Sequence, residues 1–151
     1  MVDADPLKVE RALSSGGLGC PVCAGVLRRW GWARERTVRG AGGLGLRLRP
    51  RRARCATCAR THVLLPVFVL VRRADVVAVI GWALMLAAAG AGFRAVAAQV
   101  EVAEGTVRGW LRSFRDRAEG WRVVFTRLLA ARDPVPGRIA ARGSELGDAV
   151  E

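Results

Sequence analysis

Four cysteines carry the clearest chemistry in this 151-residue chain, and they form two pairs of identical spacing. Cys20 and Cys23 enclose Pro-Val, and Cys55 and Cys58 enclose Ala-Thr. A Cys-x-x-Cys turn sets two sulfurs on one side of a tight knuckle, and two facing knuckles supply the four thiolates that Zn²⁺ binds in a tetrahedron. The spacing therefore predicts a structural Zn²⁺ site, because four thiolates leave no open position for a catalytic water.

Three alternatives to this zinc site stay open. Disulfides need an oxidising compartment, and we find no export signal among the first residues, so a cytoplasmic protein is expected. An iron–sulfur cluster would use the same four thiolates. His62, the one histidine of the chain, follows Cys58 by four residues and could replace a cysteine ligand. A surface or core position is the simpler expectation for His62, since four cysteines already suffice.

Short alternating segments between the two Cys pairs must bring the knuckles together. Three of them are predicted as strands of an antiparallel ribbon, namely Val26–Trp30, Arg34–Arg39 and Leu44–Arg49. We expect Trp30 and Trp32 to cover the metal site and the ribbon core, with base stacking as the alternative. Residues 20–66 are thus predicted as a zinc ribbon. Residues 1–19 are predicted as a flexible N-terminal segment, in which residues 7–13 could form a short helix.

The charge of the chain is strongly basic and unevenly distributed. Of its 25 cationic side chains 24 are arginines, the formal net charge is +12, and residues 20–73 alone account for +12. Arginine binds phosphate oxygens in a bidentate manner, so double-stranded DNA is the predicted partner. The predicted phosphate contacts of the ribbon are Arg47, Arg49, Arg51 and Arg52. A solvated basic face, or a codon preference for arginine, is the alternative explanation.

The segment that follows the ribbon is apolar and helical in pattern. Asp75 is predicted to cap a helix that opens with Val76, and Val76–Phe93 contains no charged residue over 18 positions. Without its glycine-rich end the helix has about 14 residues and spans roughly 21 Å, too short for a hydrocarbon core of about 30 Å. A buried helix is therefore expected, with no membrane partner.

Residues 94–112 fit a helix-turn-helix. Ala97 is small enough for the crossing point of two helices, and Val96 and Trp110 are among the apolar residues that would fix their angle. Glu101 in the turn and Ala103 at the cap depart from the common pattern. An ordinary helical hairpin is the alternative. The second helix, about 103–113, is predicted to present these residues to a major groove: Glu104, Thr106, Arg108 and Arg112.

Apolar residues continue beyond this pair at alternating steps of four and three. This seam consists of Val107, Leu111, Phe114, Ala118, Trp121, Phe125 and Leu128. Gly120 is predicted to break the helix. The seam is expected to pack on Val76–Leu86, and a homodimer formed through it is the alternative. Residues 74–132 are thus predicted as an all-α domain, and residues 133–151 as a disordered tail.

The order of these parts resembles a known family. Cys20-Pro-Val-Cys23, then Trp30-Gly31-Trp32, then the arginine-rich run Arg52–His62 and the helix pair resemble a small actinobacterial zinc-ribbon/helix-turn-helix family of unassigned function. That family is similar to the N-terminal DNA-recognition part of insertion-sequence transposases. The resemblance covers roughly residues 20–115. It implies that the four cysteines bind zinc and that Arg108 and Arg112 lie on a recognition helix. We find no three-carboxylate catalytic domain of the transposase type.

Together these patterns predict an α+β protein with an N-terminal zinc ribbon of short antiparallel strands and a C-terminal helix-turn-helix domain. The predicted function is DNA binding, as a transcription regulator or a transposase-derived recognition unit. No acid, base and nucleophile converge in the sequence, so no enzymatic activity is expected. The rival interpretation is a protein-interaction adaptor that uses the ribbon and the C-terminal helix as docking surfaces.

Overall fold

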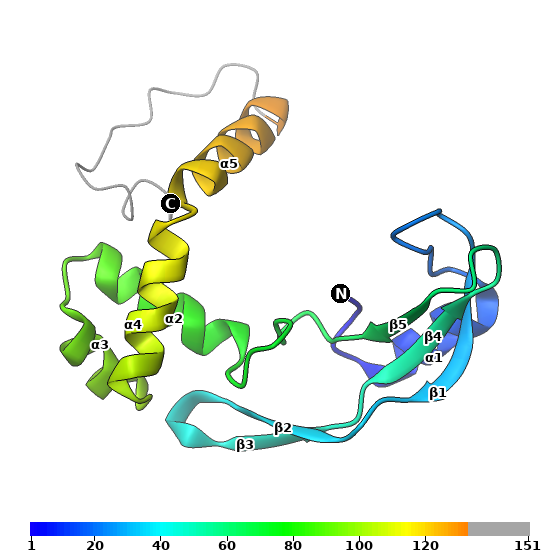
Figure 1. Cartoon of the computed structure of the whole chain (residues 1–151), viewed down its shortest axis with the longest axis horizontal. Helices are drawn as coiled ribbons and strands as arrows, with labels where there is room; N and C mark the ends of the chain where they lie inside the picture. The colour runs from blue at the N-terminus through cyan, green and yellow to red at the C-terminus, as the bar shows by residue number, and fades with distance from the viewer. Residues whose placement is uncertain (133–151) are drawn as a thin grey trace. The chain divides into compact units, whose positions relative to one another are not determined.

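The computed structural model describes residues 1–132, with strands in the N-terminal part and helices in the C-terminal part (Figure 1). The predicted α+β class is confirmed. Two compact units are present, one made of Met1–Gly40 and Leu44–Ala78, and one that contains Ala41–Gly43 and begins again at Val79. The elements in chain order are α1 Pro6–Ser15, β1 Leu27–Trp32, β2 Arg36–Arg39, the 3₁₀ turn η1 Ala41–Gly43, β3 Gly45–Leu48, β4 Arg51–Cys55, β5 Thr61–Leu64, α2 Val77–Ala88, α3 Phe93–Val100, α4 Glu104–Arg115 and α5 Ala118–Arg132.

The strands form two antiparallel sheets rather than one ribbon. One sheet has the order β1-β4-β5, and the other pairs β2 with β3. The two sheets separate at Pro50, which lies between β3 and β4 and has no N–H to donate. Its carbonyl accepts a hydrogen bond at 2.8 Å from Ala33 N, which lies between β1 and β2. Strands β4 and β5 were missed by the sequence analysis, which assigned their residues to the arginine cluster and the second knuckle.

The N-terminal segment contributes residues to the core of the first unit. The Asp5 carboxylate accepts a hydrogen bond from the Leu7 N–H at 2.8 Å and caps α1, and Gly16 ends the helix in the left-handed conformation. Val9 and Leu13 are buried in one cluster with residues of the β1-β4-β5 sheet. The short helix expected over residues 7–13 is confirmed. The flexible segment expected over residues 1–19 is replaced by a helix that packs on the sheet.

Asp75 ties the segment after β5 to the β2 strand. Its buried carboxylate accepts hydrogen bonds from Arg39 Nε at 2.8 Å and Arg39 Nη2 at 3.1 Å. Arg39 N also donates to the Ala74 carbonyl, and Val76 N donates to the Arg39 carbonyl. The Asp75 carboxylate, predicted to cap a helix opening at Val76, is therefore engaged by Arg39, and α2 begins one residue later, at Val77.

Helices α3 and α4 of the second unit pack through apolar side chains. Val96 and Ala97 on α3 and Val107 and Trp110 on α4 are buried, and residues 101–103 form the turn between the two helices. Glu101 adopts the left-handed conformation that glycine usually supplies, with φ 54°. The predicted helix pair is thus present, and α4 begins one residue later and ends two residues later than expected. Among residues 1–132, no helix is long and apolar enough to cross a bilayer.

The apolar seam divides between a packed half and an exposed half. Its residues on α4 and at the start of α5 are mostly buried, whereas Trp121, Phe125 and Leu128 are 43%, 51% and 56% exposed. The prediction that the whole seam packs on Val76–Leu86 is therefore wrong for its second half. The helix breaks between Arg115 and Ala118, and Gly120 lies inside α5. The predicted tail, residues 133–151, lies outside the described residues.

Candidate metal centre

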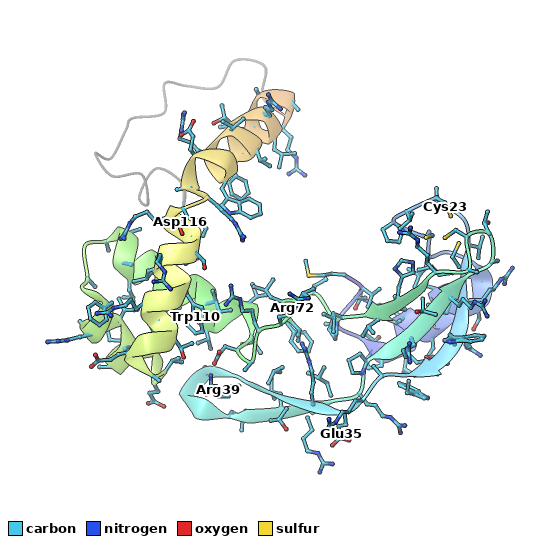
Figure 2. The ribbon with its side chains drawn as sticks, in the orientation of Figure 1. Cys23, Glu35, Arg39, Arg72, Trp110 and Asp116 are labelled. Atoms are coloured by element: carbon cyan, nitrogen blue, oxygen red, sulfur yellow. The ribbon has the colours of Figure 1, made fainter. Side chains whose placement is uncertain are left out.

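The four cysteine sulfurs converge on one point. The Sγ atoms of Cys20, Cys23, Cys55 and Cys58 all lie within 4.8 Å of one another, and Figure 2 shows sulfur atoms gathered beside Cys23. Two of the separations are 3.8 Å, from Cys20 to Cys58, and 3.5 Å, from Cys23 to Cys55. Sulfurs bound at about 2.3 Å around a tetrahedral Zn²⁺ lie about 3.8 Å apart, whereas a disulfide is about 2.05 Å long. The cluster therefore fits a metal, and its thiols are free.

Both knuckles use the same backbone turn. Ala24 and Ala59 each follow the second cysteine of their pair, and each adopts the left-handed conformation with φ 58°. Ala24 N donates to the Cys20 carbonyl at 2.8 Å, and Ala59 N donates to the Cys55 carbonyl at 3.1 Å. This repeated turn directs the two sulfurs of each pair to one side.

Backbone amides favour the thiolate at Cys55. The N–H groups of Cys58 and Thr57 each donate to Cys55 Sγ at 3.4 Å, and they lower the pKa of Cys55 to about 6. The Gly25 N–H acts in the same direction on Cys23. The neighbouring sulfurs of Cys55 and Cys58 outweigh it, so the pKa of Cys23 rises to about 11. The cluster without an ion thus retains protons, which a metal would displace on binding.

Gly25 lets the two knuckles approach each other. A Cβ atom at this position would lie 2.3 Å from Thr57 Oγ1, 2.8 Å from Thr57 Cβ and 3.1 Å from Cys55 Sγ. Ala56 N, in the second knuckle, donates to the Val26 carbonyl at 2.9 Å, which holds the knuckles at this distance. The sequence analysis missed Gly25, although its position two residues after Cys23 was a usable signal.

His62 lies beside the cluster rather than in it. It is on β5 opposite Ala53, and its Nε2 is 3.4 Å from Cys20 Sγ. This contact makes His62 a hydrogen-bonding neighbour of one ligand. Within residues 1–132 the cluster that could hold a metal ion consists of the four cysteine sulfurs predicted from their spacing, and Zn²⁺ is the ion that such a set favours.

The comparisons with known proteins agree with this part of the analysis. A family model described as a domain of unknown function, DUF6431, matches residues 20–110. The chain belongs to the DUF6431 family. No curated protein and no solved structure matched it. The matched residues include all four cysteines, both sheets and α3, and they end within α4, so the resemblance found in the sequence is confirmed at the level of a family with a four-cysteine cluster.

Arg51, in the DUF6431 region, is an internal residue of the first unit. Its side chain is only 14% exposed and pairs with the Glu10 carboxylate of α1. Its Nη1 donates to the Gly31 carbonyl at 3.3 Å, and its guanidinium lies 4.2 Å from the centre of the Trp32 ring. These contacts occupy the guanidinium, so the predicted phosphate contact of Arg51 is corrected to a structural role.

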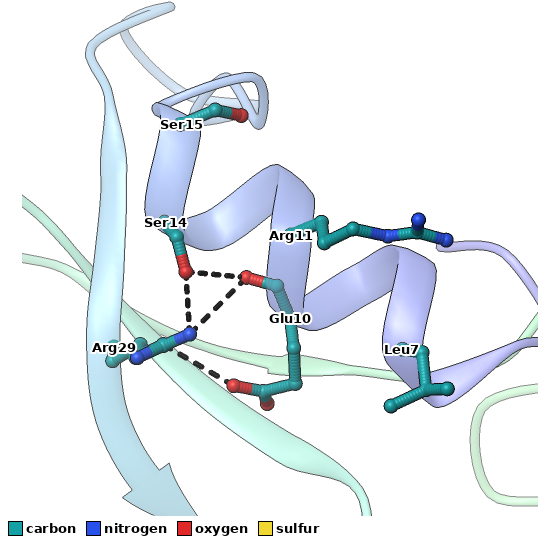
Figure 3. A pocket seen from close by; sticks show the side chains of 6 residues that line it. All are labelled: Leu7, Glu10, Arg11, Ser14, Ser15 and Arg29. Carbon is teal, nitrogen blue, oxygen red and sulfur yellow. Dashed lines mark hydrogen bonds and ion pairs between the residues drawn. The ribbon is translucent and has the colours of Figure 1, made fainter.

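Glu10 holds two arginines of the sheet at once. Besides Arg51 it pairs with Arg29 Nε at 3.2 Å, and Arg29 also bonds Ser14 Oγ (Figure 3). A single carboxylate thus links α1 to β1 and β4. An open pocket beside α1 is lined by Glu10 together with Arg11 and Arg29, so it contains an acidic side chain next to its two arginines.

The other ribbon arginines predicted to contact phosphate are more accessible. Arg47 is exposed and pairs with Glu35, with Nη2 2.6 Å from Oε1. Arg49 is exposed and lies 5.9 Å from the Trp32 ring, whereas Arg52 is half-buried. Trp30 and Trp32 remain 51% and 47% exposed. These tryptophans were expected to cover the metal site and the ribbon core, and the ring contacts found for them are with arginines, Arg51 at Trp32 and Arg54 at Trp30.

The predicted groove-facing residues lie on α4. Glu104, Arg108 and Arg112 are exposed and Thr106 is half-buried. Glu104 is 3.7 Å from Arg94, and the Arg108 guanidinium lies 4.9 Å from the centre of the Phe93 ring. The structure thus places these four side chains on one helix, α4, whose buried side chains are Val107, Trp110 and Leu111.

Proposed function

We propose that this protein binds double-stranded DNA, with α4 entering the major groove and the ribbon contacting the phosphate backbone. The observation that carries the proposal is the pair α3–α4, in which a helix with a fully buried apolar side presents a basic, exposed side. In a helix-turn-helix the second helix reads base edges, and the first crosses the backbone. The +12 net charge supports a polyanionic partner.

Two glycines support close contact with the exposed side of α4. A Cβ atom at Gly105 or Gly109 would meet nothing within 4 Å, so packing does not require glycine at either position. Glycine inside a helix costs about 1 kcal/mol relative to alanine. The lack of side chains at Gly105 and Gly109 would therefore allow another molecule to come close to the backbone of α4.

The ribbon supplies the second contact in this proposal. Zn²⁺ bound by the four cysteines would hold the two knuckles, and its role is structural because the thiolates fill the coordination shell. Arg47, Arg49 and Arg52 are the proposed phosphate contacts, without Arg51. A protein of this kind acts as a transcription regulator or as a transposase-derived recognition unit.

Duplex binding by matched glutamate variants tests the proposal. Gly105→Glu adds a negative side chain in the first turn of α4, where the helix dipole tolerates it. Gly120→Glu makes the same change in the first turn of α5, also at an exposed glycine with open space around it. We expect Gly105→Glu to abolish binding to a duplex selected from a random pool, while Gly120→Glu binds like the wild type. Both variants should keep the wild-type metal content and melting temperature.

Absence of salt-sensitive duplex binding by the wild type would overturn the proposal. It would favour the second candidate, a protein-interaction adaptor. The observation behind that candidate is the exposed apolar side of α5, where Trp121 and Phe125 stack on each other with ring centres 6.2 Å apart.

A further inference from the structure

A cavity of about 320 Å³ in the helical unit is lined by three arginines of α4. Arg108, Arg112 and Arg115 form one flank together with Leu111, and the end of α2 and the start of α3 form the rest, including Gly92 and Phe93. None of the cavity-lining side chains is acidic in the part of the chain that the structure describes. The cavity differs in this respect from the open pocket beside α1, which is lined by Glu10.

The spacing of the three arginines places them on one stripe of the helix. Positions separated by four and three residues lie one above another on an α-helix, so three guanidinium groups share the same side of α4. Like charges at this spacing repel one another, and an anion between them would relieve the repulsion. Arg108 is already oriented, because its guanidinium stacks on Phe93 at 4.9 Å.

The start of α3 adds hydrogen-bond donors to the same cavity. Its N-cap is Gly92, which offers no side chain to the amides of the first turn, and the first helical bond runs from Val96 N to the Gly92 carbonyl. A Cβ at Gly92 would meet nothing within 4 Å, and the backbone there is extended, so packing does not explain the absence of a capping side chain. Free amides and arginines together suit an oxyanion.

We propose that this cavity binds a phosphate group through Arg108, Arg112 and Arg115. Arginine forms paired hydrogen bonds with phosphate oxygens, and three of them match a tetrahedral anion better than a planar base edge. The phosphate comes either from a DNA backbone, in which case the inference rests on the proposed function, or from a free phosphate compound. Arg108 and Arg112 are thereby reassigned from base contacts to phosphate contacts. Arg115 joins them, although the sequence analysis did not select it.

Duplex binding tests the first source of phosphate. The variant R108Q/R112Q/R115Q is compared with R117Q/R127Q/R132Q, which removes three exposed arginines outside the cavity. The cavity variant should weaken preferred and scrambled duplexes by the same factor. It should also make the log–log salt dependence shallower by about 0.9, the value for one lost phosphate contact. A loss confined to the preferred duplex, or an equal loss in the control variant, overturns the inference. If the triple variant does not fold, Arg115→Gln at the exposed end of α4 replaces it.

A titration of the full-length protein with inorganic phosphate tests the second source. At constant ionic strength we expect a saturable change in the NMR signals of the Phe93–Ala95 amides, absent from the cavity variant and from a chloride titration. Phosphate binding without duplex binding would support a free ligand and would refute only the DNA proposal. Duplex binding that the cavity variant retains in full, with no phosphate response in the wild type, would refute the cavity proposal and leave the DNA proposal intact.

Discussion

Replacing Gly25 with alanine should weaken zinc binding by separating the two knuckles. The added Cβ would lie 2.3 Å from Thr57 Oγ1 and 2.8 Å from Thr57 Cβ. Rotation about χ1 moves the Oγ1 atom away, but it leaves the Cβ atom in place. The second knuckle must therefore shift, and such overpacking costs about 1–3 kcal/mol. This cost corresponds to about a 5- to 150-fold rise in the zinc dissociation constant.

Two second-site changes at Thr57 separate this steric mechanism from a general loss of stability. Thr57→Ala removes only the Oγ1 and methyl contacts, so we expect it to restore little of the affinity of Gly25→Ala. Thr57→Gly also removes the Cβ atom and should restore most of it. Thr57→Gly alone is the control, because added backbone freedom costs about 0.5–1 kcal/mol.

Competition with a chromophoric zinc chelator measures each dissociation constant, and thermal unfolding with and without zinc measures stability. The reasoning is refuted if Gly25→Ala binds zinc as tightly as the wild type. It is also refuted if Thr57→Ala and Thr57→Gly rescue the variant equally, because the Cβ contact would then contribute nothing.

Four further expectations follow from the same structure. Cys55→Ser should abolish zinc binding, measured as metal content, and should melt the strands while the helical unit keeps its circular dichroism signal. Arg51→Ala should lower the free energy of unfolding of the zinc-bound protein by about 1–3 kcal/mol in denaturant titrations, because it strips Glu10 of a partly buried partner. Arg47→Ala, which breaks an exposed ion pair, should change the same free energy by about 0–1 kcal/mol. If α5 pairs two copies of the chain, Phe125→Asp should lower the sedimentation-derived mass at high protein concentration, and an unchanged mass would exclude such pairing.

The metal cluster was predictable because its signal is local. A Cys-x-x-Cys spacing defines one knuckle by itself, and two copies define the donor set. The helix pair was predictable for a similar reason, since Val96, Val107 and Trp110 follow the helical period over a short range. The second half of the seam was not, because periodicity shows which side of a helix is apolar and does not show what covers it. Trp121 and Phe125 continue the pattern of Val107 and remain exposed.

The roles of the arginines were not predictable from the sequence. Arg47, Arg49 and Arg51 alternate along one segment and differ only in which residues the fold places beside them. The partner of Arg51 is Glu10, 41 positions earlier, on a helix that packs on the sheet. From composition alone, all three arginines would be expected to bind phosphate equally well. Only the tertiary structure separates Arg51, whose guanidinium is paired and largely buried, from Arg47 and Arg49, which remain exposed.

The small core of the N-terminal unit gives a metal at the four cysteines a large expected part in its stability. Its buried cluster contains five apolar side chains and two of the four cysteines, so the candidate ligands are themselves core residues. A core of this size supplies little stabilisation alone, and a bound metal adds folding free energy directly. The helical unit has its own buried residues on α3 and α4 and contains none of the ligands. Zinc bound by the four cysteines would therefore fix the arrangement of the ribbon arginines, whereas the arginines of α4 are positioned by the packing of α3 and α4.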